Sequence, residues 1–324
     1  MSAPARCILV TGGAGYLGGE VVGRLTKSDG VGRVVALDVR TPPIDQRVPG
    51  VEYLVGDVRD ASLVELLKSR SVESVVHLAS IVQPGGPDRR AFERSVDVGG
   101  TENVLKACVA AGVQRIVVTS SGAAYGYHAD NPVPLRESDP LRGNPEFAYS
   151  DHKRLVEELL ADCRREHPEL KQLVLRSGTI LGERTDNQIT RLFRGRFLFG
   201  PAGFDSPFVF IWDQDVAEII ARGIEQKKEG VYNLAGDGTL SPRQIAAVLG
   251  KPYLPIPVWL LKGGLWLLQR LRLTVHGPEQ VQFLQYRPVL SNEKLKSEFG
   301  YHPRKTTREA FDYYIERSRG ANGR

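Results

Sequence analysis

A glycine-rich segment near the N-terminus restricts the possible folds of this chain more than any other feature. The apolar residues 7–10 lead into Thr11-Gly12-Gly13-Ala14-Gly15-Tyr16-Leu17-Gly18, which opens a helical pattern over 17–27. Glycine is needed where a backbone turns sharply and where it approaches a pyrophosphate too closely for a Cβ atom. The N-terminus of the helix then offers unpaired N–H groups and a positive dipole end to phosphates. The segment predicts a dinucleotide-binding turn, and it is not a P-loop because no Gly-Lys-Ser/Thr follows.

On its own, such a turn is equally compatible with a plain strand–helix connection. The elements around it must therefore show whether it binds a dinucleotide. Apolar runs alternate with helical patterns over the first half of the chain, as in parallel strands joined by crossover helices. The runs are apolar throughout, as expected when helices cover both faces of a sheet. The predicted strands are 7–10, 34–37, 52–55, 74–78, 115–119 and 173–176, and the predicted helices are 17–27, 62–69, 88–111 and 148–166. This order predicts an α/β fold with a Rossmann-type, doubly wound parallel sheet.

The pattern changes after residue 176, where the helical patterns are interrupted and aromatic residues cluster. We therefore divide the chain into a dinucleotide-binding Rossmann domain, residues 1–176, and a smaller C-terminal substrate-binding region, residues 177–324. Two short apolar runs, 208–212 and 231–234, are predicted strands and candidates for a return to the main sheet.

An acidic residue at the end of the second predicted strand bears on the choice of cofactor. Asp38 follows Gly18 by about 20 residues, where a carboxylate accepts hydrogen bonds from the ribose hydroxyls and repels a 2′-phosphate. NAD is therefore favoured over NADP, although the nearby Arg40 could instead attract that phosphate. Asp57 and Val58 follow the third strand and are candidates for the adenine edge or for an ordinary turn.

Tyr149 and Lys153 stand four residues apart in a helical pattern, which places them on one face of a helix. Tyrosine alone is a poor base at neutral pH, but a neighbouring ammonium and a positively charged nicotinamide stabilise its phenolate form. Most such pairs are surface packing, and the preceding dinucleotide fingerprint is what favours a proton-transfer pair here.

Several further motifs occur in a fixed order along the chain. Taken together, they resemble the extended short-chain dehydrogenase/reductases, also called the NAD-dependent epimerase/dehydratase family. The motifs are Thr11–Gly18, Asp38, Asp57-Val58, His77-Leu78-Ala79-Ser80, Asp97-Val98-Gly99-Gly100-Thr101, Ser120-Ser121 before Tyr125-Gly126, and Tyr149–Lys153.

The resemblance implies a role for each site residue. Ser121 would bind the substrate oxygen, Tyr149 would transfer the proton, and Lys153 would hold the nicotinamide ribose and tune the tyrosine. His77 is expected to be structural. The remaining residues expected at the cofactor are Gly12, Gly15, Tyr16, Leu17, Gly18, Leu78, Ala79, Ser80, Thr119, Ser177 and Thr179, and those expected at the substrate are Gly122 and Ala123 beside Ser121.

Departures from the family pattern narrow the chemistry. Asp97 stands where the family usually has Asn, which leaves its role open. Gly122 and Ala123 replace the Asp-Glu of the sugar-nucleotide dehydratases, so elimination lacks its acid and base. Residues 177–179 lack an expected Asn, and Ser206-Pro207 lack an expected Arg, both of which lie near the diphosphate in sugar-nucleotide enzymes. These absences favour relatives that resemble hydroxysteroid dehydrogenases and dihydroflavonol reductases.

Two segments of the C-terminal region have open roles. Residues 254–273 contain Trp259, Trp266 and many leucines, but prolines, glycines and cations interrupt them, so they do not form a membrane span. They could be a helix packed in the core or a dimer, a lid over an apolar substrate, or a weak contact with a membrane surface. Arg191 and Arg194 could line a solvated face or bind an anionic group of the substrate.

Composition places few further limits on function. The net charge of +5 is spread along the chain and does not indicate nucleic acid. Three well-separated cysteines, scattered histidines and an N-terminus without a signal-like pattern predict a cytoplasmic protein without a metal.

We predict an enzyme that transfers a hydride between NAD and a secondary alcohol or ketone with an apolar body. The alternatives are a nucleotide-sugar epimerase that retains NAD, and a non-catalytic dinucleotide-binding protein. The resemblance also implies a homodimer formed by the helices 88–111 and 148–166.

Overall fold

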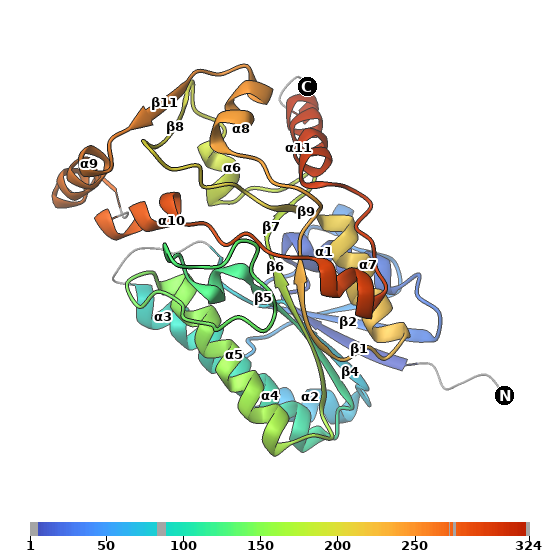
Figure 1. Cartoon of the computed structure of the whole chain (residues 1–324). Coiled ribbons are helices and arrows are strands. Elements are labelled where there is room, and N and C mark those ends of the chain that lie inside the picture. Colours follow the sequence, from blue (N-terminus) through green and yellow to red (C-terminus); the bar gives the residue numbers. More distant parts are fainter. Residues whose placement is uncertain (1–5, 83–88, 272, 275–276, 322–324) are drawn as a thin grey trace.

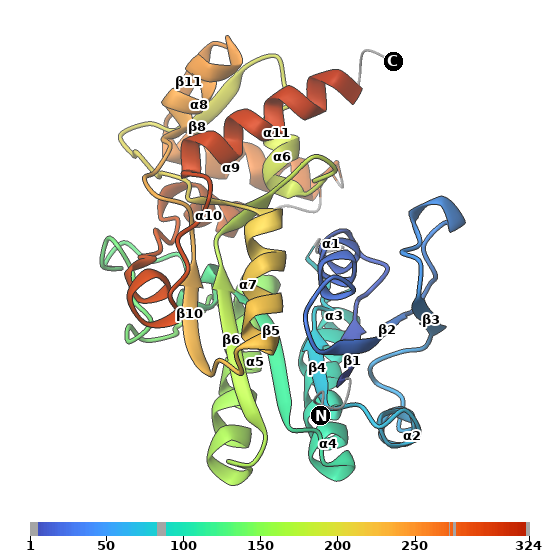
Figure 2. The ribbon, with the colours of Figure 1, turned by 90° about the vertical axis from the view of Figure 1, so that its right-hand side faces the viewer.

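The apolar runs of the first half form parallel strands of one seven-stranded sheet. The computed structural model describes residues 6–82, 89–271, 273–274 and 277–321. The sheet order is β10-β6-β5-β4-β1-β2-β3, which can be followed across Figure 2, and every pairing in it is parallel. Its strands are β1 (Arg6–Thr11), β2 (Val31–Asp38), β3 (Val51–Val55), β4 (Ser74–His77), β5 (Arg115–Ser121), β6 (Lys171–Ser177) and β10 (Gly230–Leu234).

Helices cover both faces of this sheet, as Figure 1 shows, because its strands are apolar on both sides. One face packs on α1 (Tyr16–Leu25) and α7 (Asp213–Glu225). The other packs on α2 (Leu63–Ser69), α4 (Gly100–Ala111) and α5 (Ala148–Glu166). The chain runs outward from β1 to β3 on one side and from β4 to β6 on the other. The crevice at this switch point, beyond the carboxyl ends of the strands, is where open α/β sheets bind ligands.

A second layer of short elements lies above that crevice (Figure 1). Two parallel pairs form there, β7 (Thr179–Leu181) with β9 (Phe210–Trp212), and β8 (Leu198–Pro201) with β11 (Tyr253–Ile256). Phe193, Phe210 and Phe311 form the centre of a separate aromatic core. The helices of this layer are α6 (Gln188–Leu192), α8 (Pro242–Leu249), α9 (Val258–Arg270), α10 (Val281–Gln285) and α11 (Thr307–Ala321).

The two candidate returning strands behave differently. Residues 230–234 pair with β6 as the edge strand β10, whereas 210–212 pair with β7 outside the main sheet. The predicted helix 88–111 consists of α3 (Arg90–Arg94), a π-helical turn over Ser95–Gly99, and α4, while Asp88 lies outside the described residues. Both β10 and α7 follow residue 176 in the chain, but they pack in the main sheet and on its face. The boundary at residue 176 therefore does not separate two structural units, and we keep it only as a proposal about which residues bind the cofactor and which bind the substrate.

The segment 254–273 does not pack into the core of this chain. Only Leu261 is buried in α9, and its other large apolar side chains are exposed or half-buried; Arg272 lies outside the described residues. Periodicity could not reveal this, because apolar residues surround most of the helix rather than forming one stripe. No helix in the described part of the chain is long and apolar enough to cross a membrane.

Candidate active site

The glycine-rich turn brings β1 against the start of α1 with no room for side chains. Gly12 has a φ of +70°, and a Cβ there would lie 2.8 Å from the backbone nitrogen of Ala79. A Cβ on Gly18 would overlap the carbonyl oxygen of Gly12. Gly15 is the N-cap of α1 and provides no side-chain cap, so the first N–H groups of the helix stay available to a ligand.

Asp38 lies directly beside this turn. The N–H of Ala14 donates to its Oδ2 at 3.1 Å, which holds the carboxylate at the carboxyl end of β2. Asp57, after β3, instead binds its neighbour Arg59, and this guanidinium lowers the pKa of the Asp57 carboxyl group. Val58 is buried and packs against Gly100, where a Cβ would lie 2.7 Å from Val58 Cγ2.

His77 at the end of β4 supports the turn from within the core. Thr101 donates to the carbonyl of Asp97 at 2.6 Å, so its oxygen accepts from His77 Nε2 at 3.1 Å. His77 Nδ1 is then left to accept from the hydroxyl of Thr11 at 2.7 Å. Burial, reinforced by the nearby Lys153, lowers the pKa of His77 to about 4. The imidazole is therefore a neutral link between β1, β4 and α4.

A cavity of about 550 Å³ opens at the carboxyl ends of the central strands. Most of the residues predicted at the cofactor line it. These are Gly12, Gly15, Tyr16, Leu17, Gly18, Leu78, Ser80, Thr119, Tyr149, Lys153, Ser177 and Thr179. Asp38, Asp57, Val58 and Ala79 are not in its wall, and Asp38 and Ala79 contact the turn from outside it.

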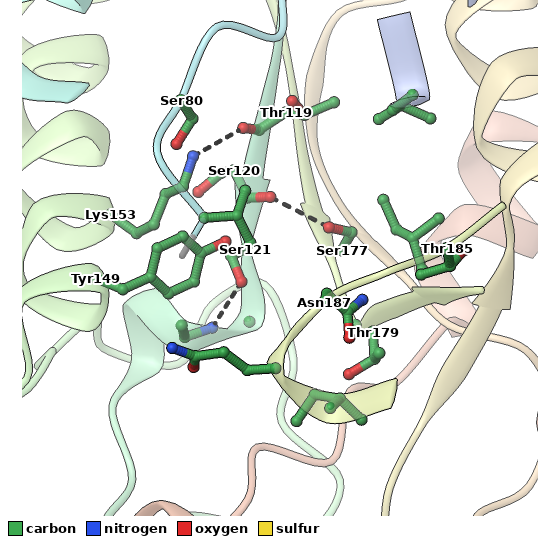
Figure 3. A pocket seen from close by; sticks show the side chains of 18 of the residues that line it. Ser80, Thr119, Ser120, Ser121, Tyr149, Lys153, Ser177, Thr179, Thr185 and Asn187 are labelled. Atoms are coloured by element: carbon green, nitrogen blue, oxygen red, sulfur yellow. Dashed lines mark hydrogen bonds between the residues drawn. The ribbon is translucent and has the colours of Figure 1, made fainter. Parts of the chain in front are cut away.

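Ser121, Tyr149 and Lys153 meet inside this cavity, as Figure 3 shows. Ser121 ends β5, and its Oγ accepts from the N–H of Ala123 at 3.2 Å, which leaves its hydroxyl hydrogen free to donate. Tyr149 and Lys153 extend from the first turns of α5, with the ammonium 5.7 Å from the tyrosine ring centre. Lys153 Nζ donates to the carbonyl of Thr119 at 3.3 Å. The Tyr149 hydroxyl forms no hydrogen bond with a described residue and points toward Ser121.

Asp97 occupies the π-helical turn behind this group. Its Oδ1 accepts from the N–H of Ile81 at 2.8 Å, and its Oδ2 lies 3.4 Å from Nδ1 of the buried His152. Burial acts to raise the pKa of Asp97, but His152, Lys153 and the Ile81 N–H hold it below its ordinary value. Asp97 thus anchors the strand-end loop that carries Ser80.

The part of the cavity away from the glycine-rich turn is aromatic. Tyr127, Phe147 and Phe283 pack edge to face or tilted, with ring centres 5.1–5.9 Å apart. Phe208 and Leu290 extend this wall, beside Gly122 and Ala123 at the end of β5. Sequence patterns could not group these rings, because they come from distant segments.

One cation lies in this wall, and it is not one of those predicted. The guanidinium of Arg287 sits between Phe208 and Phe283, 3.8 and 4.3 Å from their ring centres. Its Nε has no hydrogen-bond partner among the described residues, and burial lowers its pKa to about 9, so it stays charged at neutral pH. Arg191 and Arg194, by contrast, are exposed outside the cavity and form ion pairs with Asp186.

Asn187 is a further wall residue that sequence reasoning missed. It caps α6 through a capping box with Thr190, a pattern readable from Asn187-Gln188-Ile189-Thr190. The family pattern directs attention instead to residues 177–179, at the end of β6, where this chain has no asparagine. No local signal marks Arg287, which follows α10 and is held by a hydrogen bond from its N–H to Ser206 Oγ at 3.1 Å.

Comparison with known proteins places the chain among dinucleotide-dependent enzymes. The model of the family described as "NAD dependent epimerase/dehydratase family" matches residues 8–235. An uncharacterised protein of Mycobacterium tuberculosis is 28% identical over 322 residues, which cover 97% of this chain and 84% of that protein. The UDP-glucose 4-epimerase of Erwinia amylovora is 33% identical over 193 residues, 56% of each chain.

A solved structure shows the same fold. The UDP-glucose 4-epimerase of Thermus thermophilus, in complex with NAD, superposes with a TM-score of 0.74 over 97% of this chain and 99% of that one. The two sequences are 24% identical, so this likeness concerns the fold alone.

Proposed function

The chain belongs to the NAD-dependent epimerase/dehydratase family, and from this premise we propose that it transfers a hydride between NAD and a secondary alcohol or ketone. The observation that carries the proposal is the meeting of Ser121, Tyr149 and Lys153 in one cavity with the glycine-rich turn. A non-catalytic dinucleotide-binding protein would have no need of a free tyrosine hydroxyl beside a buried lysine.

The residues around the turn fit a dinucleotide. The space at Gly12 and Gly18, which a Cβ would fill, allows a pyrophosphate to approach the backbone and the N-terminus of α1. Asp38 would accept the hydrogen bonds of the adenosine ribose, and its charge favours NAD over NADP. Lys153 would hold the nicotinamide ribose. NAD, when bound, supplies the hydride acceptor or donor.

The proton is handled by the chain itself. Ser121 donates a hydrogen bond to the substrate oxygen and holds it at Tyr149. The Tyr149 Oη accepts the hydroxyl proton during oxidation and returns it during reduction. Lys153 stabilises the phenolate form through its positive charge and is fixed by the Thr119 carbonyl. Gly122 and Ala123 provide no second acid or base, so this site favours hydride transfer without elimination.

The aromatic wall favours a substrate with an apolar body. Tyr127, Phe147 and Phe283 would pack against it, because apolar and aromatic surfaces provide most of the contact area in small-molecule sites. With its apolar body against these rings, the substrate would direct its reacting carbon toward the part of the cavity that would hold the nicotinamide.

A nucleotide-sugar epimerase is the second candidate, and Arg287 is the observation that favours it. The Nε of its guanidinium has no hydrogen-bond partner among the described residues, and the backbone N–H of Arg287 donates to Ser206 Oγ. The guanidinium would therefore take the place of the arginine that Ser206-Pro207 lack. Such a group suits a phosphate or diphosphate through charge-assisted hydrogen bonds. An epimerase would oxidise and re-reduce one carbon while keeping its NAD.

The proposed chemistry is tested by Tyr149→Phe, which removes the transferable proton and keeps the ring. Turnover should fall by at least 100-fold, the scale of general acid–base catalysis. NAD affinity, measured by calorimetry, should stay within a few-fold of the native value. Activity of Tyr149→Phe close to that of the native enzyme would refute the proton-transfer role.

The substrate class is tested by a turnover screen of steroid-like, aryl and acyl ketones against a panel of nucleotide sugars. We expect the apolar ketones to react faster, with an empty cofactor site in the purified enzyme by mass spectrometry. Epimerisation of a nucleotide sugar, lost in Arg287→Leu and kept in the matched Arg191→Leu, would instead establish the second candidate. Arg191 is the matched control because it lies outside the cavity.

A further inference from the structure

The helix α9 carries a large apolar surface that nothing in the described chain covers. Trp259 is 74% exposed and Trp266 is 58% exposed, one on each side of the middle of the helix. Leu260, Leu267, Leu268 and Leu271 are also exposed, and only Leu261 of the helix is buried. In Figure 1 the helix lies at the outer edge of the molecule, away from the sheet. Soluble proteins rarely leave so large a continuous apolar patch without a partner.

Along the sequence, the charged residues near this helix are mostly basic, although the turn Pro278–Gln280 that packs against α9 contains Glu279. Between Asp237 and Glu279 the sequence contains no acidic residue and five basic ones, Arg243, Lys251, Lys262, Arg270 and Arg272. Lys262 and Arg270 are exposed on α9 itself and form no ion pair with a described residue. Tryptophan, leucine and unpaired cations on one short helix are the composition of helices that lie in a membrane interface.

A second copy of the chain is a poor occupant of the same patch. Most dimers are two-fold symmetric, so each copy presents the same patch to the other. Lys262 and Arg270 would then face the same cations without an acidic residue on α9 to pair with them. A bilayer containing anionic lipids satisfies both features, since it takes up the apolar side chains and attracts the cations.

We propose that α9 docks this protein on the surface of a membrane that contains anionic phospholipids. The helix lies in the interface with Trp259 and Trp266 inserted among the head groups, while Lys262 and Arg270 contact lipid phosphates. Docking does not depend on the chemistry proposed above. Because α9 packs on α10, which carries Phe283 of the cavity wall, it also brings the cavity close to the lipid surface.

The test is flotation of the full-length protein with two kinds of vesicle. One contains phosphatidylcholine alone, and the other contains phosphatidylcholine with a quarter of phosphatidylglycerol. We expect binding to the second kind, at least tenfold stronger than to the first and weakened by salt. Trp259→Ala/Trp266→Ala should reduce binding at least tenfold to both, and Lys262→Glu/Arg270→Glu should remove the preference for phosphatidylglycerol.

A matched control replaces two exposed apolar residues elsewhere. Ile44 and Val133 are 84% and 73% exposed, so Ile44→Ala/Val133→Ala should bind vesicles as the native protein does. All variants should keep native circular dichroism. The proposal is overturned if the native protein binds neither vesicle, or if the control loses binding equally. A third result would also overturn it: the native protein does not bind vesicles, and light scattering shows that it is a dimer which only the Trp259→Ala/Trp266→Ala variant dissociates.

Discussion

Gly18→Ala places a single methyl group at the tightest point of the dinucleotide turn. The added Cβ would overlap the Gly12 carbonyl oxygen and lie 2.9 Å from the Cα of Gly13. These are backbone atoms, so no side-chain rotation relieves the contact, and the turn itself must move. Overpacking of this kind costs about 1–3 kcal/mol of stability. If the movement breaks one N–H bond to a phosphate, binding loses about 1.5–3 kcal/mol, or about 10- to 150-fold in Kd.

The adjacent glycine provides a control in the same helix. Gly19 has open space where a Cβ would stand, so Gly19→Ala should raise stability by about 0.5–1 kcal/mol through the higher helix propensity of alanine. The assays are urea unfolding and calorimetric titration with NAD. The reasoning is refuted if Gly18→Ala binds NAD as tightly as Gly19→Ala, because the turn would then not lie at the pyrophosphate.

Three further perturbations test other parts of the site. Asp38→Ser should raise NADP affinity at least tenfold relative to NAD in direct titrations, since it removes the charge opposing a 2′-phosphate; a native preference for NADP would contradict this. Lys153→Met should weaken NAD binding and slow turnover together, and unchanged affinity would exclude the ribose contact. His77, with its pKa lowered to about 4, binds fewer protons in the folded than in the unfolded state, so its stabilising effect is lost as pH falls from 6.5 toward 4. Between pH 7.5 and 5 this loss is about 2 kcal/mol, and urea unfolding of the non-titrating His77→Gln should show an acid loss smaller by that amount.

The fold of residues 1–176 could be predicted well from the sequence because its signals are local. A short, continuously apolar run predicts a strand that helices cover on both faces. All six runs predicted in residues 1–176 lie in the main sheet. Tyr149 and Lys153 share a helical spacing, and the order of the motifs shows that they follow the strand ending at Ser121. These features depend on neighbours in the chain or on a fixed βα order.

The C-terminal region depends on contacts that no local pattern encodes. Arg191 and Arg194 are close in sequence, which suggests an anion site, yet Asp186 binds both at the surface. Arg287 reaches the cavity only because Ser206 and two aromatic rings from separate segments hold it there. The run 208–212 has the composition of a buried strand, and only tertiary packing decides that residues 210–212 pair with β7 rather than with the main sheet.

The place of β10 at the edge of the sheet means that the C-terminal region is not a separable module. The chain leaves the sheet after β6, forms much of the upper layer, and returns with α7 and β10 to cover the side of β6 and the apolar face of α1. A chain cut at residue 176 would expose the hydrogen-bonding edge of β6, a surface that promotes aggregation. Exchange of substrate specificity between relatives by recombination must therefore carry the returning strand with it, or be confined to insertions between β6 and α7 and after β10.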